Sequence, residues 1–320
     1  MRRPDAGALF QLAWDVGGVV PPALVRGALV LGADVAWARR GGGVRQLERN
    51  LDRVAPGQSA RALRRMSHRA MRSYMRYYAE AFTLRRASRE QLVARVRFVD
   101  DGGLIGVRDA GGSAVAALSH MGNWDLAGAW AGVALMPVLS VAERLKPDRL
   151  FREFLEFRES VGMRILALGD DGVFPELIRT AERGGTLVCL LADRDLTARG
   201  IEVELAGRTA RVAAGPAALA VASGAPLFPV SIRYERLRGA RRRAARTPWG
   251  IVVTIHEEVE IDRSLPRKQQ VAVATQGWVT TLGGAIAAHP WDWHMLQKVF
   301  VEDLDADRYA QTRQEAGDHD

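Results

Sequence analysis

The sequence predicts an α/β protein, a single domain in which a central, mostly parallel and twisted sheet is flanked by helices. Short apolar runs of strand length alternate with segments of helical periodicity, which is the pattern of strands joined through helices. No repeat, low-complexity tract or clear linker divides the 320 residues, a length that suits one large domain. An apolar share of 48% is ample for a packed core.

Two short apolar helices are predicted within residues 7–38. Apolar residues recur at helical spacing from Leu9 to Val19, and Pro21-Pro22 ends this helix and opens the next. The longest uncharged run inside this stretch, Val16 to Val25, has ten residues, fewer than the roughly 20 of a spanning helix. Nor does this stretch have a signal peptide's layout of basic start, short apolar core and small-residue cleavage site. The pattern is typical of helices that lie on a membrane surface, or of a helical hairpin packed on the core.

The remaining elements follow in the order of the α/β pattern. Residues 61–82 predict one long helix with an aromatic face. The expected strands are 114–118, 138–141, 164–168, 186–192, 201–205, 227–233 and 250–256. The expected helices beside them are 124–135, 148–160, 172–184, 215–223 and 267–288.

Several kinds of chemistry are excluded by what the sequence lacks. The single cysteine, Cys189, lies in the apolar run 186–192 and is expected to be inert strand packing. A disulfide framework is impossible, which fits a reducing compartment, and the six histidines form no close metal-ligand group. Gly41-Gly42-Gly43 follows no strand, and Gly-x-Gly-x-x-Gly is absent, which argues against a nucleotide enzyme. We expect no metal and no tightly held cofactor.

The positive charge is concentrated in one part of the chain. Residues 36–97 contain sixteen arginines against four acids, whereas residues 302–320 contain seven acids against two arginines. A basic stretch of this kind attracts polyanions, either an anionic membrane surface or nucleic acid, although it can also be a plain solvated face.

His120 and Asp125 are the main candidates for chemistry. The apolar run 114–118 ends at Ser119-His120, turns through Gly122-Asn123 and enters a helical pattern near Trp124. A histidine at the end of a buried strand faces the crevice where open α/β sheets bind their ligands. A carboxylate five residues later, in the first helical turn, can hold one ring nitrogen and leave the other to accept a proton. The pair therefore predicts a general base that acts on a substrate hydroxyl, against the alternative of an N-cap and a core histidine.

Three further polar segments are expected at the same crevice. They are Glu143-Arg144-Leu145-Lys146-Pro147 after a short strand, Phe157-Arg158-Glu159 in a helix, and Asp193-Arg194-Asp195 directly after the strand 186–192. The last is the most suggestive, because three charges at the end of a buried strand are seldom packing residues. Its alternative is a solvated turn.

Together these segments resemble the glycerolipid acyltransferase superfamily, and within it the bacterial lipid A lauroyl/myristoyl-type branch. The shared features are His-x4-Asp, Glu-Arg-x-Lys-Pro, the Phe-Arg-Glu helix and Asp-Arg-Asp before a short strand pair. The runs 141–147, 158–162 and 288–297 look most like the actinobacterial phosphatidylinositol mannoside acyltransferases. The resemblance extends over about residues 5 to 310.

The resemblance implies a peripheral enzyme on the cytoplasmic side of the cell membrane. It would transfer a palmitoyl-type chain from acyl-CoA, its co-substrate, to a mannose 6-hydroxyl of a phosphatidylinositol mannoside. The expected partners are thus acyl-CoA, a glycolipid acceptor and an anionic membrane surface, and not nucleic acid.

The resemblance also assigns roles to residues. His120 would be the base and Asp125 its orienting partner, with Asp193 as a third catalytic residue that bonds to the acceptor hydroxyl or to the histidine. Glu143, Arg158, Arg194, Asp195 and Asn123 are expected to bind substrate. The sequence departs from the mannoside branch at Asp193, where that branch usually has glutamate, and at residues 204–207, where it tends to have an aromatic pair. These departures affect the acceptor more than the reaction class. For the oxyanion of the reaction, Arg158 and backbone amides of residues 123–125 are the candidate donors.

Two other functions stay open at this stage. One is a related acyltransferase with a lipid A-type or lysophospholipid acceptor, and the other is a membrane-binding or nucleic-acid-binding protein without enzymatic activity. The expected organisation is membrane-facing amphipathic helices in residues 1–40, an acyltransferase domain in 41–301 and an acidic, disordered tail in 302–320.

Overall fold

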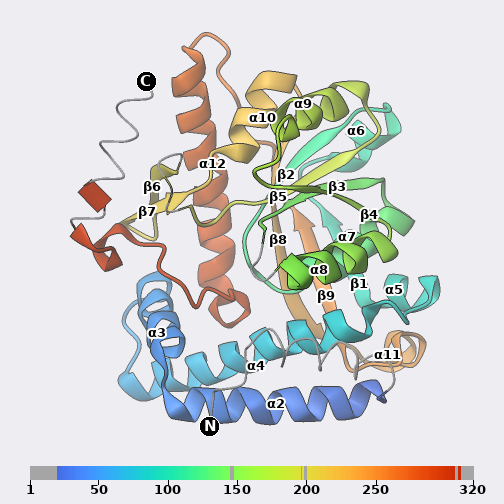
Figure 1. Cartoon of the computed structure of the whole chain (residues 1–320), viewed down its shortest axis with the longest axis vertical. Helices are drawn as coiled ribbons and strands as arrows, with labels where there is room; N and C mark the ends of the chain where they lie inside the picture. Colours follow the sequence, from blue (N-terminus) through green and yellow to red (C-terminus); the bar gives the residue numbers. More distant parts are fainter. Residues whose placement is uncertain (1–19, 145–147, 196, 198–199, 307–308, 311–320) are drawn as a thin grey trace.

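A central sheet crosses the computed structural model and carries helices on both faces, as the sequence predicts (Figure 1). The structure describes residues 20–144, 148–195, 197, 200–306 and 309–310. Over these residues the main sheet has seven strands in the order β1-β9-β8-β2-β5-β3-β4, and β6 and β7 form a separate hairpin. The strands are β1 Val96–Asp100, β2 Ala114–Leu118, β3 Val138–Ala142, β4 Met163–Ala167, β5 Leu187–Leu191, β6 Ile201–Leu205, β7 Arg208–Val212, β8 Leu227–Arg236 and β9 Trp249–Ile255.

The helices include those that the sequence predicts between the strands. Described helices are α2 Pro22–Arg39, α3 Gly42–Val54, α4 Ala60–Leu84, α5 Arg89–Arg95, α6 Leu104–Asp109, α7 Trp124–Ala134, α8 Asp148–Ser160, α9 Val173–Arg183, α10 Gly215–Ser223, α11 Gly239–Ala245 and α12 Arg267–Ala288. Short 3-10 turns follow at Pro290–Asp292 (η1) and Val301–Asp303 (η2). No ranges were predicted from the sequence for the strands β1 and β7 or for the helices α3, α5, α6 and α11.

The directions of the strands bring the carboxyl ends of five of them to one edge of the sheet. Every neighbouring pair of the main sheet is parallel except β8 and β9, which are antiparallel. The carboxyl ends of β2, β3, β4, β5 and β8 therefore meet at the same edge, where ligands bind in open α/β sheets.

Alternate residues of β2 point to opposite faces of the sheet and pack into the core on both sides. Ala114, Ala116 and Leu118 pack on the side of α7 and α8, while Val115 and Ala117 pack on the side of α9, α10 and α12. A strand buried on both faces is a continuous apolar run, which is why 114–118 was recognisable from sequence.

The helices α2, α3 and α4 lie together below the sheet edge (Figure 1). They share a small core that includes Ala33, Leu47, Leu51 and Met71. The second predicted amino-terminal helix is thus present as α2, and one of its faces packs on α4. The first predicted helix lies within residues 1–19, outside the described residues.

The start of the predicted acidic tail is part of the fold. Asp303 in η2 accepts hydrogen bonds from Arg53 and Gln46, and Glu302 lies 2.6 Å from the Arg53 guanidinium. Residues 311–320 lie outside the described residues.

One described helix, α12, is long and apolar enough to cross a membrane by length and composition alone. Its face with Trp278, Leu282 and Ile286 is buried against the sheet and hairpin. A core helix of this kind passes the same test.

Candidate active site

His120 and Asp193 form the central pair of the site. The imidazole Nδ1 lies 2.6 Å from Asp193 Oδ1, and the backbone N–H of His120 donates to Oδ2 at 2.9 Å. Because a carboxylate only accepts hydrogen bonds, Nδ1 is the protonated ring nitrogen and Nε2 keeps its lone pair. The pair therefore presents a ring nitrogen able to take a proton.

The register of two neighbouring strands brings these residues together. Leu118 of β2 is paired with Leu191 of β5, and both strands end there. Two residues beyond the end of each strand, His120 and Asp193 contact each other outside the sheet edge. Trp293 adds a hydrogen bond from its indole N–H to Asp193 Oδ2 at 2.8 Å.

Asp193 is buried and nevertheless favours the charged form. Burial raises its carboxyl pKa, but attraction to the His120 imidazolium and hydrogen bonds from His120 and Trp293 outweigh burial and leave the pKa below its ordinary value. The carboxylate can therefore hold the imidazole and stabilise its protonated form.

The predicted pairing of Asp125 with His120 is wrong in its geometry. Asp125 lies in the first turn of α7, where its Oδ1 accepts a hydrogen bond from Arg158 Nε at 2.8 Å and its Oδ2 accepts one from the Tyr77 hydroxyl at 2.7 Å. No hydrogen bond joins Asp125 to His120 in the described structure. The helix turns the carboxylate toward α4 and α8, and the strand end of β5 supplies the partner instead.

Asp125, Arg158 and Tyr77 form a buried polar group beside the pair. Burial would lower the pKa of Arg158, but the Asp125 charge and its hydrogen bond raise it overall, so the guanidinium is always charged. Burial and the same carboxylate raise the pKa of Tyr77 well above its ordinary value, so the phenol stays protonated as a donor. Arg158 thus lies near the site, as predicted, with its Nε engaged by Asp125.

The turn between His120 and α7 requires a glycine. Gly122 has φ +64°, and a Cβ there would lie 2.5 Å from the backbone oxygen of Ile232. Asn123 then caps α7, since its Oδ1 accepts from the N–H of Leu126 and its Nδ2 donates to Glu80 at 2.6 Å. Asn123 is fully buried with both amide atoms engaged, so we correct its predicted substrate-binding role to a structural one.

The other predicted binding residues are not brought to the pair. Glu143 is exposed at the end of β3, without a hydrogen bond or ion pair among the described residues. Arg194 donates to the backbone oxygen of Lys298 at 3.3 Å, and Asp195 accepts from the N–H of Thr197 in a local turn. The solvated-turn alternative thus describes the contacts of Arg194 and Asp195 but not those of Asp193.

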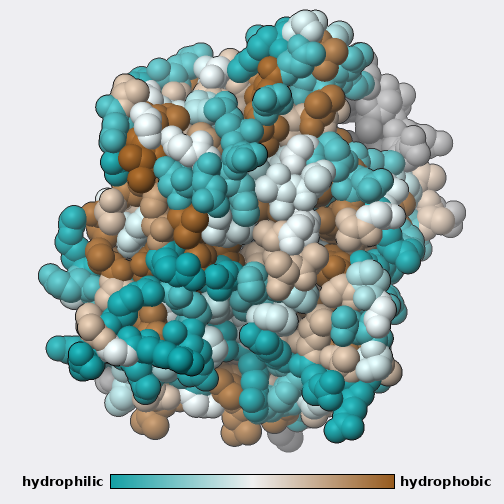
Figure 2. Space-filling model, turned by 180° about the vertical axis from the view of Figure 1, so that it is seen from behind, coloured by the Kyte–Doolittle hydropathy of each residue, from teal (hydrophilic) through white to brown (hydrophobic). Residues whose placement is uncertain are grey.

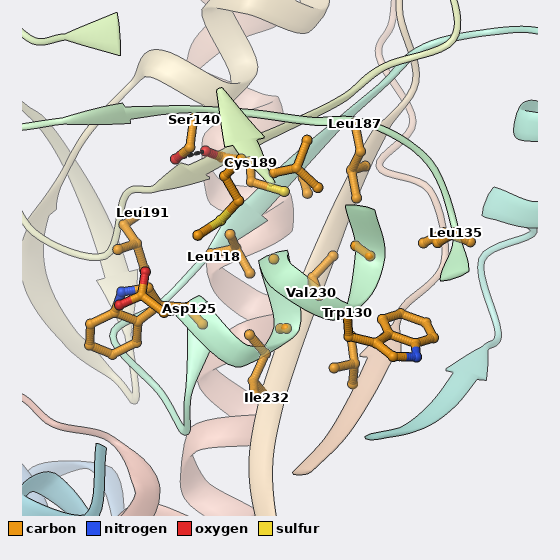
Figure 3. Close-up of a pocket in the computed structure, with 18 of the residues that line it drawn as sticks. Leu118, Asp125, Trp130, Leu135, Ser140, Leu187, Cys189, Leu191, Val230 and Ile232 are labelled. Atoms are coloured by element: carbon orange, nitrogen blue, oxygen red, sulfur yellow. Dashed lines mark hydrogen bonds between the residues drawn. The ribbon is translucent and has the colours of Figure 1, made fainter. Parts of the chain in front are cut away.

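An apolar cavity opens beside these groups, between the sheet and α7 (Figure 3). It contains about 710 Å³ of unfilled space, the part open to solvent included. Asp125 and Leu191 lie toward one end of it, and Trp130, Leu135 and Leu187 toward the other. Its polar lining groups are Trp124, Asp125, Ser140, Arg158 and Cys189. The lining is therefore mainly apolar, with Asp125 at one end.

The single cysteine, Cys189, lies in the lining of the cavity. Burial raises the pKa of the Cys189 thiol to about 12, as expected for inert packing in a strand. Among the described residues no three His, Cys, Asp or Glu side chains group as metal ligands would.

Three residues of the site were missed as functional by the sequence analysis. Tyr77 appeared there only as part of an aromatic helix face, and Trp124 and Trp293 only as members of motifs. Trp124 stacks on Tyr77 with ring centroids 4.2 Å apart and meets the His120 ring edge-on at 5.4 Å. Only the spatial neighbourhood reveals these contacts.

A mostly parallel sheet with a strand-end histidine and carboxylate beside an apolar cavity suits an acyltransferase, and the comparisons show that class. The sequence profile of the bacterial lipid A biosynthesis acyltransferase family matches residues 7–302, and the chain belongs to this family. It is an acyltransferase.

Curated relatives narrow the comparison. The chain is 38% identical to the phosphatidylinositol mannoside acyltransferase of Mycolicibacterium smegmatis, over 94% of this chain and 93% of that protein. It is 36% identical to the protein of the same name from Mycobacterium tuberculosis strain H37Rv, over 95% of this chain and 91% of that protein. The predicted resemblance is confirmed, and the alternative of a protein without enzymatic activity is excluded.

Proposed function

We propose that this acyltransferase moves a palmitoyl-type chain from acyl-CoA to a mannose 6-hydroxyl of a phosphatidylinositol mannoside. The observation that carries the proposal is the His120–Asp193 pair beside an apolar cavity, in a chain whose relatives are named for this acceptor. The donor, the chain and the hydroxyl are part of the proposal.

The proposed reaction needs one base and no metal. His120 Nε2 takes the proton of the acceptor hydroxyl as its oxygen attacks the thioester carbonyl carbon. Asp193 holds Nδ1–H and stabilises the imidazolium. When the tetrahedral intermediate collapses, the C–S bond breaks, the ester carbonyl forms, and the coenzyme A thiolate receives the proton from the imidazolium.

The cavity supports a long acyl chain. Each methylene moved from water into an apolar site contributes about 0.8 kcal/mol. A chain that enters past Asp125 toward Trp130 and Leu135 would leave its thioester near Trp124 and His120. Asp125 and Arg158 then lie near the polar end of the chain.

We place the enzyme on the cytoplasmic side of the cell membrane, with α2 toward the lipid. The residues that α2 exposes between Pro22 and Val35 are apolar or glycine, and Leu24 and Leu31 are each 65% exposed. Figure 2 shows hydrophobic surface among hydrophilic residues along the lower edge, where α2 lies in Figure 1. Exposed apolar residues on a helix, beside arginines, suit binding to an anionic membrane surface.

An acceptor screen tests the proposal. The full chain is incubated with palmitoyl-CoA and, separately, a phosphatidylinositol mannoside, a glucosamine lipid of the lipid A type and a lysophospholipid, and products are read by mass spectrometry. We expect one added palmitoyl group on the mannoside alone. The variant H120A should lose transfer by roughly 10²–10⁴-fold, the usual contribution of a general base.

Different results would contradict the assigned acceptor and the assigned base. Acylation of the glucosamine lipid or the lysophospholipid in place of the mannoside would overturn the acceptor. Full transfer by H120A would overturn the base while leaving the acceptor assignment intact.

A further inference from the structure

The indole N–H of Trp124 is a buried donor without an acceptor. Its Nε1 is shielded from solvent and has no hydrogen-bond partner among the described residues. Tryptophan N–H groups in protein interiors are normally paired, and a specific exception calls for an explanation.

Location separates this donor from the other unpaired atoms. Unpartnered buried side-chain atoms of the described residues also occur in Ser119, Trp278 and His294. Of all the residues with such an atom, Trp124 is the one that lines the apolar cavity. A molecule that reaches this wall of the cavity can therefore supply the acceptor that the described residues do not.

The Trp124 ring is also close to the base and firmly held. It meets the His120 ring edge-on with centroids 5.4 Å apart and an interplanar angle of 78°. Its face stacks on Tyr77, whose hydroxyl is fixed by Asp125. A donor held in place before the reaction stabilises developing charge without reorganisation.

We infer that Trp124 is a further catalytic residue, whose indole N–H donates a hydrogen bond to the carbonyl oxygen of the thioester as that oxygen becomes negative. This inference rests on the proposed acyl transfer. When the acceptor oxygen attacks, the carbonyl π electrons move to this oxygen, and the Trp124 N–H stabilises the oxyanion. The electrons return as the C–S bond breaks, so the residue itself gains and loses no proton.

Arg158, one of the oxyanion donors that the sequence suggested, is already held by a carboxylate. Its Nε is engaged by Asp125 at 2.8 Å, and the two form a buried ion pair. The indole N–H of Trp124, its only strong donor, has no partner among the described residues.

The test compares the full-chain enzyme with W124F, which keeps an aromatic ring and removes the N–H. We expect kcat for palmitoyl transfer to fall by about 10²-fold, the usual effect of losing one oxyanion donor. Binding of S-hexadecyl-CoA, a thioether that lacks the carbonyl oxygen, should change by less than about threefold, because this bond forms to the oxyanion. The matched control is W278F, which removes an equally unpaired buried N–H from α12, outside the cavity; its kcat should equal that of the wild type.

A second variant covers the case in which W124F folds poorly. Trp124→3-benzothienylalanine keeps the bicyclic shape and replaces the ring N–H by sulfur, and it should lose kcat to the same extent. If both variants fold and retain kcat within threefold while H120A is inactive, the role of Trp124 is overturned and the proposed function stands. If the wild type transfers no acyl group to any acceptor, the proposed function itself fails.

Discussion

Two histidines at the same site have opposite environments. His120 has an ionised partner, Asp193, and a partly exposed side chain. His294 is buried, its backbone N–H donates to the His120 carbonyl oxygen at 2.7 Å, and its Nε2 lies 3.1 Å from Ser73 Oγ. Burial, together with the positive charges of Arg76 and His120, lowers the pKa of His294 to about 3. One ring is therefore arranged to take a proton and the other to stay neutral.

His294 should make folding stability depend on pH. An unfolded histidine binds a proton below about pH 6.5, whereas His294 in the fold does not until about pH 3, so the unfolded state binds more protons between these values. Stability is therefore lost as pH falls through this window. Between pH 7.5 and 5 we expect the free energy of unfolding of the wild type to decrease by about 2 kcal/mol more than that of H294N. Urea titrations at the two pH values measure the difference, and equal decreases in both proteins would show that His294 titrates normally.

Secondary-structure elements differ in how much their sequences reveal. The strand 114–118 is buried on both faces and reads as one apolar run, whereas β1, with Arg97 and Asp100, has intermediate burial and mixed polarity. The sequence therefore predicts β2 and not β1. Strand order is a property of the whole chain, and for this reason the register of Leu118 with Leu191, which joins His120 to Asp193, was not available from sequence.

The two faces of helix α2 have different surroundings. Its inner face packs on α4, with Asp34 bonded to Arg72 and His68, and its outer face exposes Leu24, Leu31 and Val35. These apolar residues lie on one stripe of the helix. One face of α2 thus packs on α4, and the opposite face is the one that we propose lies on the membrane.

The outer face of α2 leads to a prediction about lipid binding. L31E should weaken sedimentation with phosphatidylglycerol-containing vesicles by about tenfold or more, because it replaces an apolar contact by a charge in the interface. The matched control is V273E on the exposed side of α12, where Val273 is 54% exposed; its vesicle binding should equal that of the wild type. Loss of binding in V273E, with none in L31E, would move the membrane-facing surface to α12.

Over the whole molecule, the arginines of residues 36–97 serve several purposes. Arg53, Arg72 and Arg95 form ion pairs with acids from other elements, and Arg69 and Arg76 stack on Trp291 and Trp249. Some of these arginines therefore join helices to one another and to the rest of the fold. The composition indicated a polyanion partner, but it could not distinguish this internal use from surface charge.

The same whole-molecule view separates the roles of the two carboxylates. Fold, family and the location of His120 were predictable, because each depends on local pattern. The choice between two partners for His120 was not. The sequence made Asp125 the main partner and gave Asp193 a bond to the histidine or to the acceptor, whereas in the structure Asp193 bonds to His120 from the neighbouring strand and Asp125 turns to Arg158. We expect Asp193 to serve the chemistry and Asp125 to hold α4, α7 and α8 together.

The most direct test of this account is the rate of palmitoyl transfer by D193N and D125N at saturating substrates, measured with their melting temperatures. In D193N the side-chain N–H₂ can face Nδ1, which favours the tautomer with no lone pair at Nε2, so kcat should fall by about 10²–10⁴-fold with the fold retained. In D125N the loss of a buried ion pair should chiefly lower stability, by about 3–5 kcal/mol. Wild-type kcat in D193N, together with a folded but inactive D125N, would contradict the account and restore Asp125 as the partner of His120.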